Sequence, residues 1–170
     1  NQITRRARNF SKKQAPNLEL LDLNQTVQQG VDFVRLQAED ERVKISLNLD
    51  PSSPQVLADQ TQLSQVVINL LLNAIEALAD HHGKRNLCVE TTADGDDYVQ
   101  LTVSDTGPGT PADTQLLVFE PFYTTKANGL GIGLGLCRSI IDQHHGKMVL
   151  ESEVDNGTRI GFSLPRLPID

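Results

Sequence analysis

Several residue types are scarce in this chain of 170 residues, which has no tryptophan, one methionine and two cysteines. So few cysteines exclude a disulfide-stapled scaffold. Cys88 and Cys137 lie far apart in apolar stretches, so we interpret them as buried thiols in a reducing compartment and not as a disulfide or metal pair. No apolar run approaches the length of a membrane span, and no signal peptide opens the chain.

Basic residues are also fewer than acidic ones, which gives a net charge of -7. A general nucleic-acid binder needs a basic face, so this balance argues against that class. Hydrophobic residues at 38% and charged residues at 22% are typical of one soluble domain. Since the first residue is Asn1 and not methionine, we expect a fragment of a larger protein, whose membrane segments, if any, lie outside it.

Hydrophobic periodicity and turn residues divide the chain into alternating elements. Helices are expected over about 25–40 with Asn24 as N-cap, over about 59–81 with Asp59 and Gln62 in a capping-box-like arrangement, over about 134–144, and over a shorter stretch at 112–118. Extended segments are expected over 18–23, 43–49, 87–92, 98–104, 147–153 and 158–164. This order predicts an α/β domain whose sheet is built largely from hairpins and whose helices cover one face.

The helix expected at 59–81 is apolar over most of its circumference, but one narrow stripe is polar. At about 100° per residue the stripe is about 80° wide, and it consists of Gln62, Gln65, Asn69, Asn73 and Glu76. Asparagine is a poor helix former, and its amide oxygen is a suitable ligand for a hard cation such as Mg²⁺. The stripe is therefore either a ligand-facing surface or the solvent side of the helix, and the helix alone does not decide between them.

A short glycine-containing segment, Asp105-Thr-Gly107-Pro-Gly109, follows directly on an expected strand. A carboxylate at a strand end accepts a hydrogen bond from an exocyclic amine such as that of adenine, and the glycines let the backbone approach a flat ligand closely. Taken alone, a segment of this kind is usually only a turn.

A second glycine-rich stretch, Gly129 to Leu136, leads into the helix expected near its end. Backbone N–H groups and the helix dipole at such a start favour an anion. The stretch is not a P-loop, because no Gly-Lys-Ser/Thr closes it, and Leu134 stands where a dinucleotide fingerprint has its third glycine. Between the two stretches, residues 119–126 form either a mobile lid over phosphates or a packed loop.

In combination, these segments resemble the ATP-binding catalytic domain of sensor histidine kinases, within the superfamily shared with gyrase-type and mismatch-repair-type ATPases. The segment from Asn69 to Glu76 is similar to the family's N box, and the segment from Asp105 to Gly109 to its first glycine box. Residues 119–126 resemble the F box, and residues 131–136 resemble the second glycine box. The four boxes occur in the family's order and spacing, and the likeness extends over residues 17–165.

The resemblance implies a Bergerat-type fold, a two-layer α/β sandwich with a mixed sheet. Residues 1–16 would be the end of the preceding dimerisation and phosphoacceptor helix with its linker, and residues 17–170 the catalytic domain. ATP and Mg²⁺ would be the cofactors, with Asn73 holding the metal, Asn69 nearby, and Asp105 binding the adenine amine. The other nucleotide-binding residues that the resemblance implies are Gly107, Gly109, Thr124, Thr125, Lys126, Gly131, Ile132, Gly133, Leu134, Gly135 and Thr158.

Two features of the sequence bear on the reaction: a residue that differs from the superfamily's hydrolases, and the lack of an acceptor histidine in the first part of the chain. The superfamily's hydrolases have a glutamate one turn before the Mg²⁺-binding asparagine, but this chain has Asn69, which favours phosphoryl transfer over hydrolysis. Residues 1–58 contain no histidine, so we expect the acceptor histidine outside the fragment and no catalytic residue within it. The histidines at 81, 82, 144 and 145 are expected in helix-end or core roles.

By the same resemblance, the partners would be the protein's own phosphoacceptor hairpin and the receiver domain of a response regulator, and not a nucleic acid. The domain would be cytoplasmic, the full-length protein a homodimer and the fragment a monomer. Two alternatives remain. One is a non-catalytic nucleotide-binding docking module, although the binding boxes are intact and nothing in the sequence argues for lost activity. The other is an ATP hydrolase of the gyrase type, which Asn69 disfavours.

Overall fold

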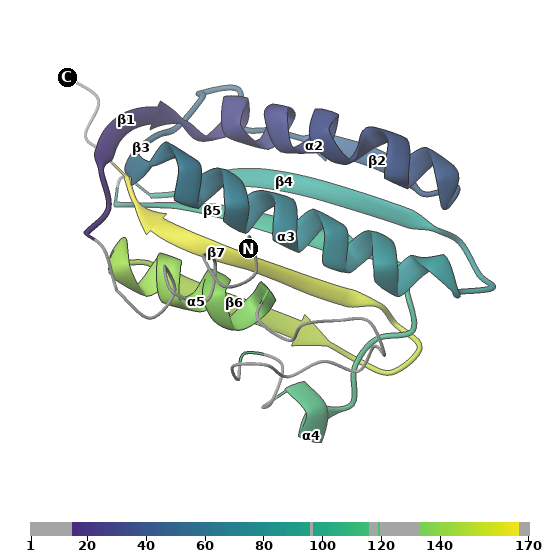
Figure 1. Cartoon of the computed structure of the whole chain (residues 1–170). Helices are drawn as coiled ribbons and strands as arrows, with labels where there is room; N and C mark the ends of the chain where they lie inside the picture. The colour runs from purple at the N-terminus through teal and green to yellow at the C-terminus, as the bar shows by residue number, and fades with distance from the viewer. Residues whose placement is uncertain (1–14, 96, 116–118, 120–132, 167–170) are drawn as a thin grey trace, which may run out of the picture.

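The computed structural model describes residues 15–95, 97–115, 119 and 133–166. They form two layers, a five-stranded sheet and three longer helices that lie side by side on one of its faces (Figure 1). In chain order, the elements are β1 (Leu18–Asp22), α2 (Leu23–Asp40), β2 (Lys44–Asn48), β3 (Gln55–Asp59), α3 (Gln60–Ala79), β4 (Asn86–Asp94), β5 (Tyr98–Asp105), α4 (Ala112–Gln115), α5 (Gly133–Gln143), β6 (Lys147–Ser152) and β7 (Thr158–Pro165).

The strand order in the large sheet is β2-β4-β5-β7-β6. β2 runs parallel to β4, whereas the other neighbouring strands are antiparallel, so the sheet is mixed. The hairpins β4–β5 and β6–β7 supply most of its strands, as the turn residues in the sequence predict. The predicted α/β sandwich with a mixed sheet and helices on one face is therefore confirmed.

A strand that the sequence does not predict, β3, pairs with β1 in a separate two-stranded antiparallel sheet. Only Val56 and Ala58 of β3 are buried apolar residues. Pro51 and Pro54, which come just before it, are turn signals and suggest a loop. The pattern within β3 is too short to be recognised without its partner β1.

The start of α2 also differs from the prediction. Asp22, and not Asn24, is the N-cap, and its carboxylate accepts a hydrogen bond from the Asn24 backbone amide at 2.9 Å. The Asn24 side chain points inward, where Nδ2 donates to the Asp50 carbonyl at 2.7 Å and Oδ1 accepts from the Thr91 hydroxyl at 2.6 Å. A residue suited to capping instead satisfies buried polar groups between α2 and β4.

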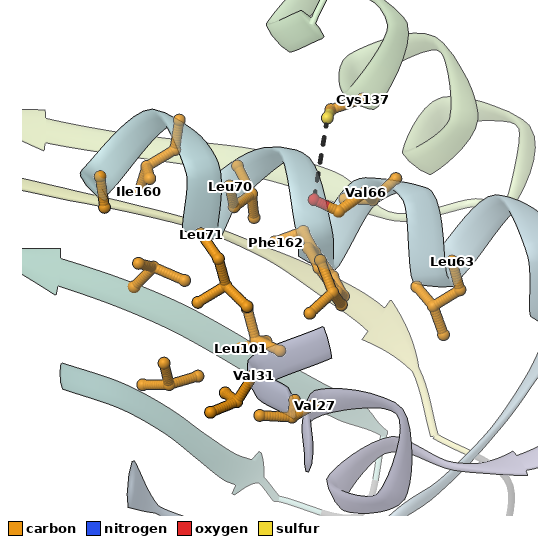
Figure 2. Close-up of a cluster of buried hydrophobic side chains, with 14 of the residues drawn as sticks. Val27, Val31, Leu63, Val66, Leu70, Leu71, Leu101, Cys137, Ile160 and Phe162 are labelled. Atoms are coloured by element: carbon orange, nitrogen blue, oxygen red, sulfur yellow. Dashed lines mark hydrogen bonds between the residues drawn. The ribbon is translucent and has the colours of Figure 1, made fainter. Parts of the chain in front are cut away.

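The core is centred on α3, which lies between α2 and α5 (Figure 1). Figure 2 shows its apolar side chains beside those of the sheet and of α2, and Leu70, Leu71, Leu101 and Phe162 are fully buried. Burying one such side chain stabilises the fold by about 1.5–3 kcal/mol. The broad apolar arc predicted for this helix therefore supplies the main contact between the two layers.

Within the described part of the chain, α3 is also long and apolar enough to cross a membrane, judged by length and composition alone. The expectation that no apolar run approaches a membrane span was therefore too strong. Because α3 packs between two helices and the sheet, with Leu63 and Leu78 fully buried, we interpret it as a core helix.

Candidate functional site

Asp105 is the last residue of β5 and lies opposite Thr158, the first residue of β7. Val103 is buried beneath the helices, and side chains alternate along a strand, so Asp105 lies on this helix-covered face. Its Oδ1 accepts a hydrogen bond from the Gly107 amide at 2.9 Å. Burial raises the pKa of Asp105, although hydrogen bonds from the Gly107 and Thr158 backbones oppose this. The carboxylate is thus held in place, half-buried, at the end of the sheet.

The first glycine segment approaches both α3 and the β6–β7 hairpin closely. A Cβ atom at Gly107 would lie 2.9 Å from Asp105 Oδ1 and 3.5 Å from the Ala77 carbonyl of α3. Gly109 has a φ of +74°, and a Cβ there would lie 2.0 Å from the Glu153 carbonyl oxygen. Both glycines thus allow close approach to other parts of the chain, whereas the approach to a flat ligand that the sequence suggests stays a prediction.

The turn between β6 and β7 completes this part of the site. Gly157 has a φ of +82°, and a Cβ there would lie 2.0 Å from the Asp105 carbonyl oxygen. We call Asp105, Gly107, Gly157 and Thr158 the Asp105 corner. An open depression of about 340 Å³ lies at this end of the sheet. Its lining includes Asp105, Ser152, Gly157 and Thr158, but also Ser104, Glu151 and Arg159 from the alternate positions of the strands, and no described residue of α3.

On α3, the two asparagines of the polar stripe are both half-buried. Asn69 Nδ2 contacts Cys137 Sγ of α5 at 3.8 Å. The side-chain amide of Asn73 has no hydrogen-bond partner among the residues that the structure describes. The stripe therefore borders α5 at Asn69, which argues against the alternative that it is merely the solvent side of a surface helix.

Helix α5 runs antiparallel to α3. Near its C-terminal end, His144 Nε2 accepts a hydrogen bond from the Asp59 amide at 3.0 Å, at the start of α3, while Cys137 contacts Asn69 further along. Continuing in that direction, the first turn of α5 lies beside the Asn69–Asn73 part of α3. Backbone N–H groups in a first helical turn lack partners within the helix and carry positive potential. The asparagine amides of α3 therefore lie near the start of α5, which attracts anions.

The His144 contact changes one predicted detail of the α3 cap. Asp59 caps the helix by accepting from the Gln62 amide at 3.0 Å, as predicted. The Asp59 amide, however, donates to His144 and not to the Gln62 side chain, whose Oε1 is buried without a hydrogen-bond partner in the described part of the chain. His144 itself is 5% exposed, in agreement with the core role expected of it.

The predicted site residues are only partly within the described structure. Thr124, Thr125, Lys126, Gly131 and Ile132 lie outside the described residues. Gly133, Leu134 and Gly135 form the start of α5. Leu134 packs against the core, so only its backbone is available to a ligand, whereas a Cβ at Gly133 would meet nothing within 4 Å.

Phe119, at the start of the segment resembling the F box, packs against the core. The guanidinium of Arg138 on α5 lies 5.9 Å from the centroid of its ring, within the range of a cation–π contact. Phe119 therefore anchors the start of this segment to the core.

The prediction of buried thiols is confirmed for one of the two cysteines. Cys137 is fully buried, and burial raises the pKa of its thiol to about 12. Cys88 is free as well but only half-buried, so the expectation of a buried thiol is wrong there. Cys88 alternates with the buried Leu87 and Val89 on β4 and therefore lies on the sheet face opposite the helices.

Sequence reasoning missed Ser152, the last residue of β6, although it is the most connected side chain near the Asp105 corner. Its hydroxyl lies within hydrogen-bond distance of the Thr110 amide, the Gly157 carbonyl and the Thr158 hydroxyl. A serine before a turn is common, so no local pattern distinguishes this one. Only the pairing of β6 with β7 places it beside Thr158.

Comparison with known proteins places this geometry in context. The sequence profile of the family described as "Histidine kinase-, DNA gyrase B-, and HSP90-like ATPase" matches residues 58–168. The sensor protein FixL of Bradyrhizobium diazoefficiens is 37% identical over 164 residues, which are 96% of this chain and 32% of FixL. Sporulation kinase E of Bacillus subtilis is 36% identical over 92% of this chain and 21% of its own length. The chain thus spans a third or less of these relatives.

Solved structures with a similar fold include two of the histidine kinase ThkA. Its nucleotide-free catalytic domain superimposes with a TM-score of 0.77 at 30% identity, covering 88% of this chain and 96% of that domain. ThkA in complex with the response regulator protein TrrA matches with a TM-score of 0.80 at 28% identity, covering 98% of this chain and 47% of the ThkA chain.

Proposed function

Because the chain belongs to the family of histidine kinase-, DNA gyrase B- and HSP90-like ATPases, we propose that it is the ATP-binding catalytic domain of a two-component sensor histidine kinase. The observation that carries this proposal is the convergence of three features on one side of α3. These are the Asp105 corner at the sheet end, the amide of Asn73, and the first turn of α5. They suit the base, the metal and the phosphates of ATP respectively.

Asp105 is the proposed adenine-binding residue. Its carboxylate, fixed by the Gly107 amide at 2.9 Å, accepts a hydrogen bond from the exocyclic amine of the base. Thr158 lies opposite it on β7 and contributes a second polar contact. Gly107 and Gly109 have no room for a side chain beside Asp105 Oδ1 and the Glu153 carbonyl, so they allow the chain to fold closely around Asp105.

The phosphates are proposed to lie at the start of α5, where the backbone amides of Gly133, Leu134 and Gly135 attract negative charge. Gly131 and Ile132 would extend this amide surface, and Thr124, Thr125 and Lys126 would cover the phosphates from the lid segment. Lys126 would contribute the positive charge.

Asn73 is the proposed Mg²⁺ ligand, and its surroundings fit the ion. Its half-buried amide has no competing hydrogen bond in the described part of the chain and lies beside the anion-attracting turn of α5. A single protein oxygen leaves the other positions to water and phosphate, which Mg²⁺ prefers. When bound, Mg²⁺ neutralises phosphate charge and fixes the orientation of the phosphates.

Transfer of the γ-phosphoryl group to a histidine, and not hydrolysis, is the proposed reaction. Asn69 stands one turn before Asn73, where a water-activating carboxylate would be needed, and its amide has no basic group. Asn69 also contacts Cys137, which holds its side chain against α5. The residues of this chain then act by positioning ATP and excluding water rather than by acid–base chemistry.

The acceptor histidine is proposed to lie on the parent protein's dimerisation hairpin, since residues 1–58 contain none. From there the phosphoryl group would pass to an aspartate of a response-regulator receiver domain, a class of partner that ThkA binds. The parent protein would be a homodimer with this domain in the cytoplasm, whether or not it carries a membrane anchor.

Calorimetric titration of the domain with ATP, with and without Mg²⁺, tests the nucleotide site. Binding should require Asp105 and be lost in Asp105→Asn, while the exposed control Asp40→Asn binds like the wild type. Absence of wild-type binding up to millimolar ATP would overturn the proposed site.

The reaction is tested separately in the parent protein by detection of phosphohistidine after incubation with ATP. Its appearance supports the kinase. ATP binding without any phosphohistidine would favour the non-catalytic docking module, and steady ATP turnover that is abolished in Asn69→Ala would favour a hydrolase.

A further inference from the structure

We propose that Ser152 determines the base specificity of the nucleotide site, because it fixes the direction of the Thr158 hydroxyl so that this hydroxyl can only accept a hydrogen bond from the base. The inference rests on the proposed function, since it concerns the same ATP site. Its physical basis is the arrangement of hydrogen-bond partners around one serine oxygen.

Ser152 Oγ has three polar neighbours. The Thr110 amide donates to it at 2.7 Å, the Gly157 carbonyl lies at 3.1 Å, and Thr158 Oγ1 lies at 2.8 Å. The amide is always a donor and the carbonyl always an acceptor. Only the Ser152–Thr158 pair is ambiguous, because either hydroxyl is chemically able to donate to the other.

The Gly157 carbonyl removes this ambiguity. A hydroxyl has one proton and two acceptor lone pairs. If Ser152 donates its proton to Gly157, its lone pairs accept from Thr110 and from Thr158, and every group is satisfied. If Ser152 donates to Thr158 instead, the carbonyl of the buried Gly157 keeps only the Glu153 amide, at a long 3.4 Å. Leaving a buried acceptor poorly paired is costly, so the first arrangement is favoured.

Two contacts from α4 hold this arrangement in place. Gln115 Nε2 donates to the Thr110 carbonyl at 2.7 Å and to the Ser152 carbonyl at 2.7 Å. The side chain of Gln115 therefore ties the strand end at Ser152 to the backbone that follows the first glycine segment. As a result, the Thr110 amide stays directed at the Ser152 hydroxyl and continues to occupy one of its lone pairs.

As a result, Thr158 donates its only proton to Ser152 and presents only lone pairs to the proposed base site. Asp105, on the neighbouring strand, is also an acceptor when ionised. Two adjacent acceptors match a base edge that carries an amine, as adenine does. A base with a carbonyl at that position, such as hypoxanthine or guanine, would place an acceptor against them and leave buried groups unpaired.

Dissociation constants of ATP and of inosine triphosphate, measured by calorimetry on the same preparation, test this inference. The wild type should bind ATP at least about tenfold more tightly than inosine triphosphate. In Ser152→Ala, Thr158 regains a free proton and is able to donate, so the preference should narrow by about tenfold. Ser152→Thr retains the hydroxyl and should keep the wild-type preference, as should the control Ser163→Ala.

A purely structural role of Ser152 predicts a different result, in which both nucleotides weaken by the same factor and their ratio is unchanged. That result would overturn the inference. If Ser152→Ala does not fold, Thr158→Val replaces it, because Val leaves the Ser152 bonds to Thr110 and Gly157 intact, and the ratio should again narrow. Equal wild-type binding of the two nucleotides would reject the specificity role alone, whereas no binding of either would reject the nucleotide site itself.

Discussion

Two asparagines on neighbouring helices, Asn24 on α2 and Asn73 on α3, have very different surroundings. Asn24 is 9% exposed, and its side chain donates to the Asp50 carbonyl and accepts from the Thr91 hydroxyl. Asn73 is half-buried and has no hydrogen-bond partner in the described part of the chain. Buried polar groups are normally paired, so the paired amide of Asn24 indicates a structural role. The partly exposed amide of Asn73 makes no such contact and is available to a ligand.

Replacement of Asn73 should have the largest effect on activity and almost none on stability. Asn73→Ala removes the proposed metal ligand and should abolish autophosphorylation of the parent protein, measured as phosphohistidine. The free energy of unfolding of the domain should stay constant or rise by about 0.5 kcal/mol, because alanine is the better helix former. Gln65→Ala, on the exposed part of the same stripe, is the matched control and should leave activity unchanged. Undiminished phosphorylation in Asn73→Ala would contradict the metal-binding role.

Asp105 should show a trade-off between binding and stability that depends on pH. Its pKa in the folded protein is raised above the usual 3.8, mainly by burial. The ionised carboxylate therefore destabilises the ligand-free fold at neutral pH, and this penalty disappears as the pH falls through the raised pKa toward 3.8. Asp105→Asn, which can still accept from the Gly107 amide, should melt at a higher temperature than the wild type at pH 7.

The difference in melting temperature between Asp105→Asn and the wild type should shrink as the pH is lowered, since the other carboxyl groups are common to both proteins. Thermal melts of both proteins without nucleotide, taken from pH 7 down to pH 4, measure this difference. A wild type that is the more stable of the two at pH 7 would show that Asp105 has a structural role like that of Asn24.

Replacement of Asn24 should have the opposite pattern to that of Asn73. Asn24→Ala removes the acceptor of the buried Thr91 hydroxyl proton and one of two donors to the Asp50 carbonyl, which keeps the Ser53 amide. This loss should cost about 1–3 kcal/mol in the free energy of unfolding. Urea unfolding measures this cost, and the exposed control Gln28→Ala should stay within about 0.5 kcal/mol of the wild type. ATP affinity should be unchanged, and a selective loss of binding without loss of stability would remove the distinction between the two asparagines.

The same contrast explains which features could be predicted from the sequence. The apolar periodicity of α3, its Asp59 cap and the turn residues between paired strands are local patterns, and they predicted the helix and the hairpins. Only the family resemblance suggested that Thr158 belongs with Asp105. The role of Asn24 could not be predicted, because an asparagine before a helix suits both a cap and a buried contact. Its role depends on Asp50 and Thr91, which are distant in sequence.

Short elements and side-chain networks were missed for a related reason. β3 is recognisable only beside β1, with which it pairs over a long stretch of chain. Ser152 pairs with Thr158 within one hairpin, but its contact with the Thr110 amide joins residues 42 positions apart. Cys88 was expected to be buried because its neighbours Leu87 and Val89 are apolar. Its own side chain, however, alternates to the sheet face without helices.

The last prediction concerns how firmly α5 packs against α3 at Asn69. Cys137 packs against Asn69, and burial raises its thiol pKa to about 12, so very little reactive thiolate forms at pH 8. Cys88 is half-buried and should react with a thiol reagent at least about a hundredfold faster in the native domain. Cys88→Ser isolates the slow reaction, and both thiols should react alike in denaturant. Fast native labelling of Cys137 would mean that α3 and α5 separate at Asn69, so that Asn69 would be as open to a ligand as Asn73.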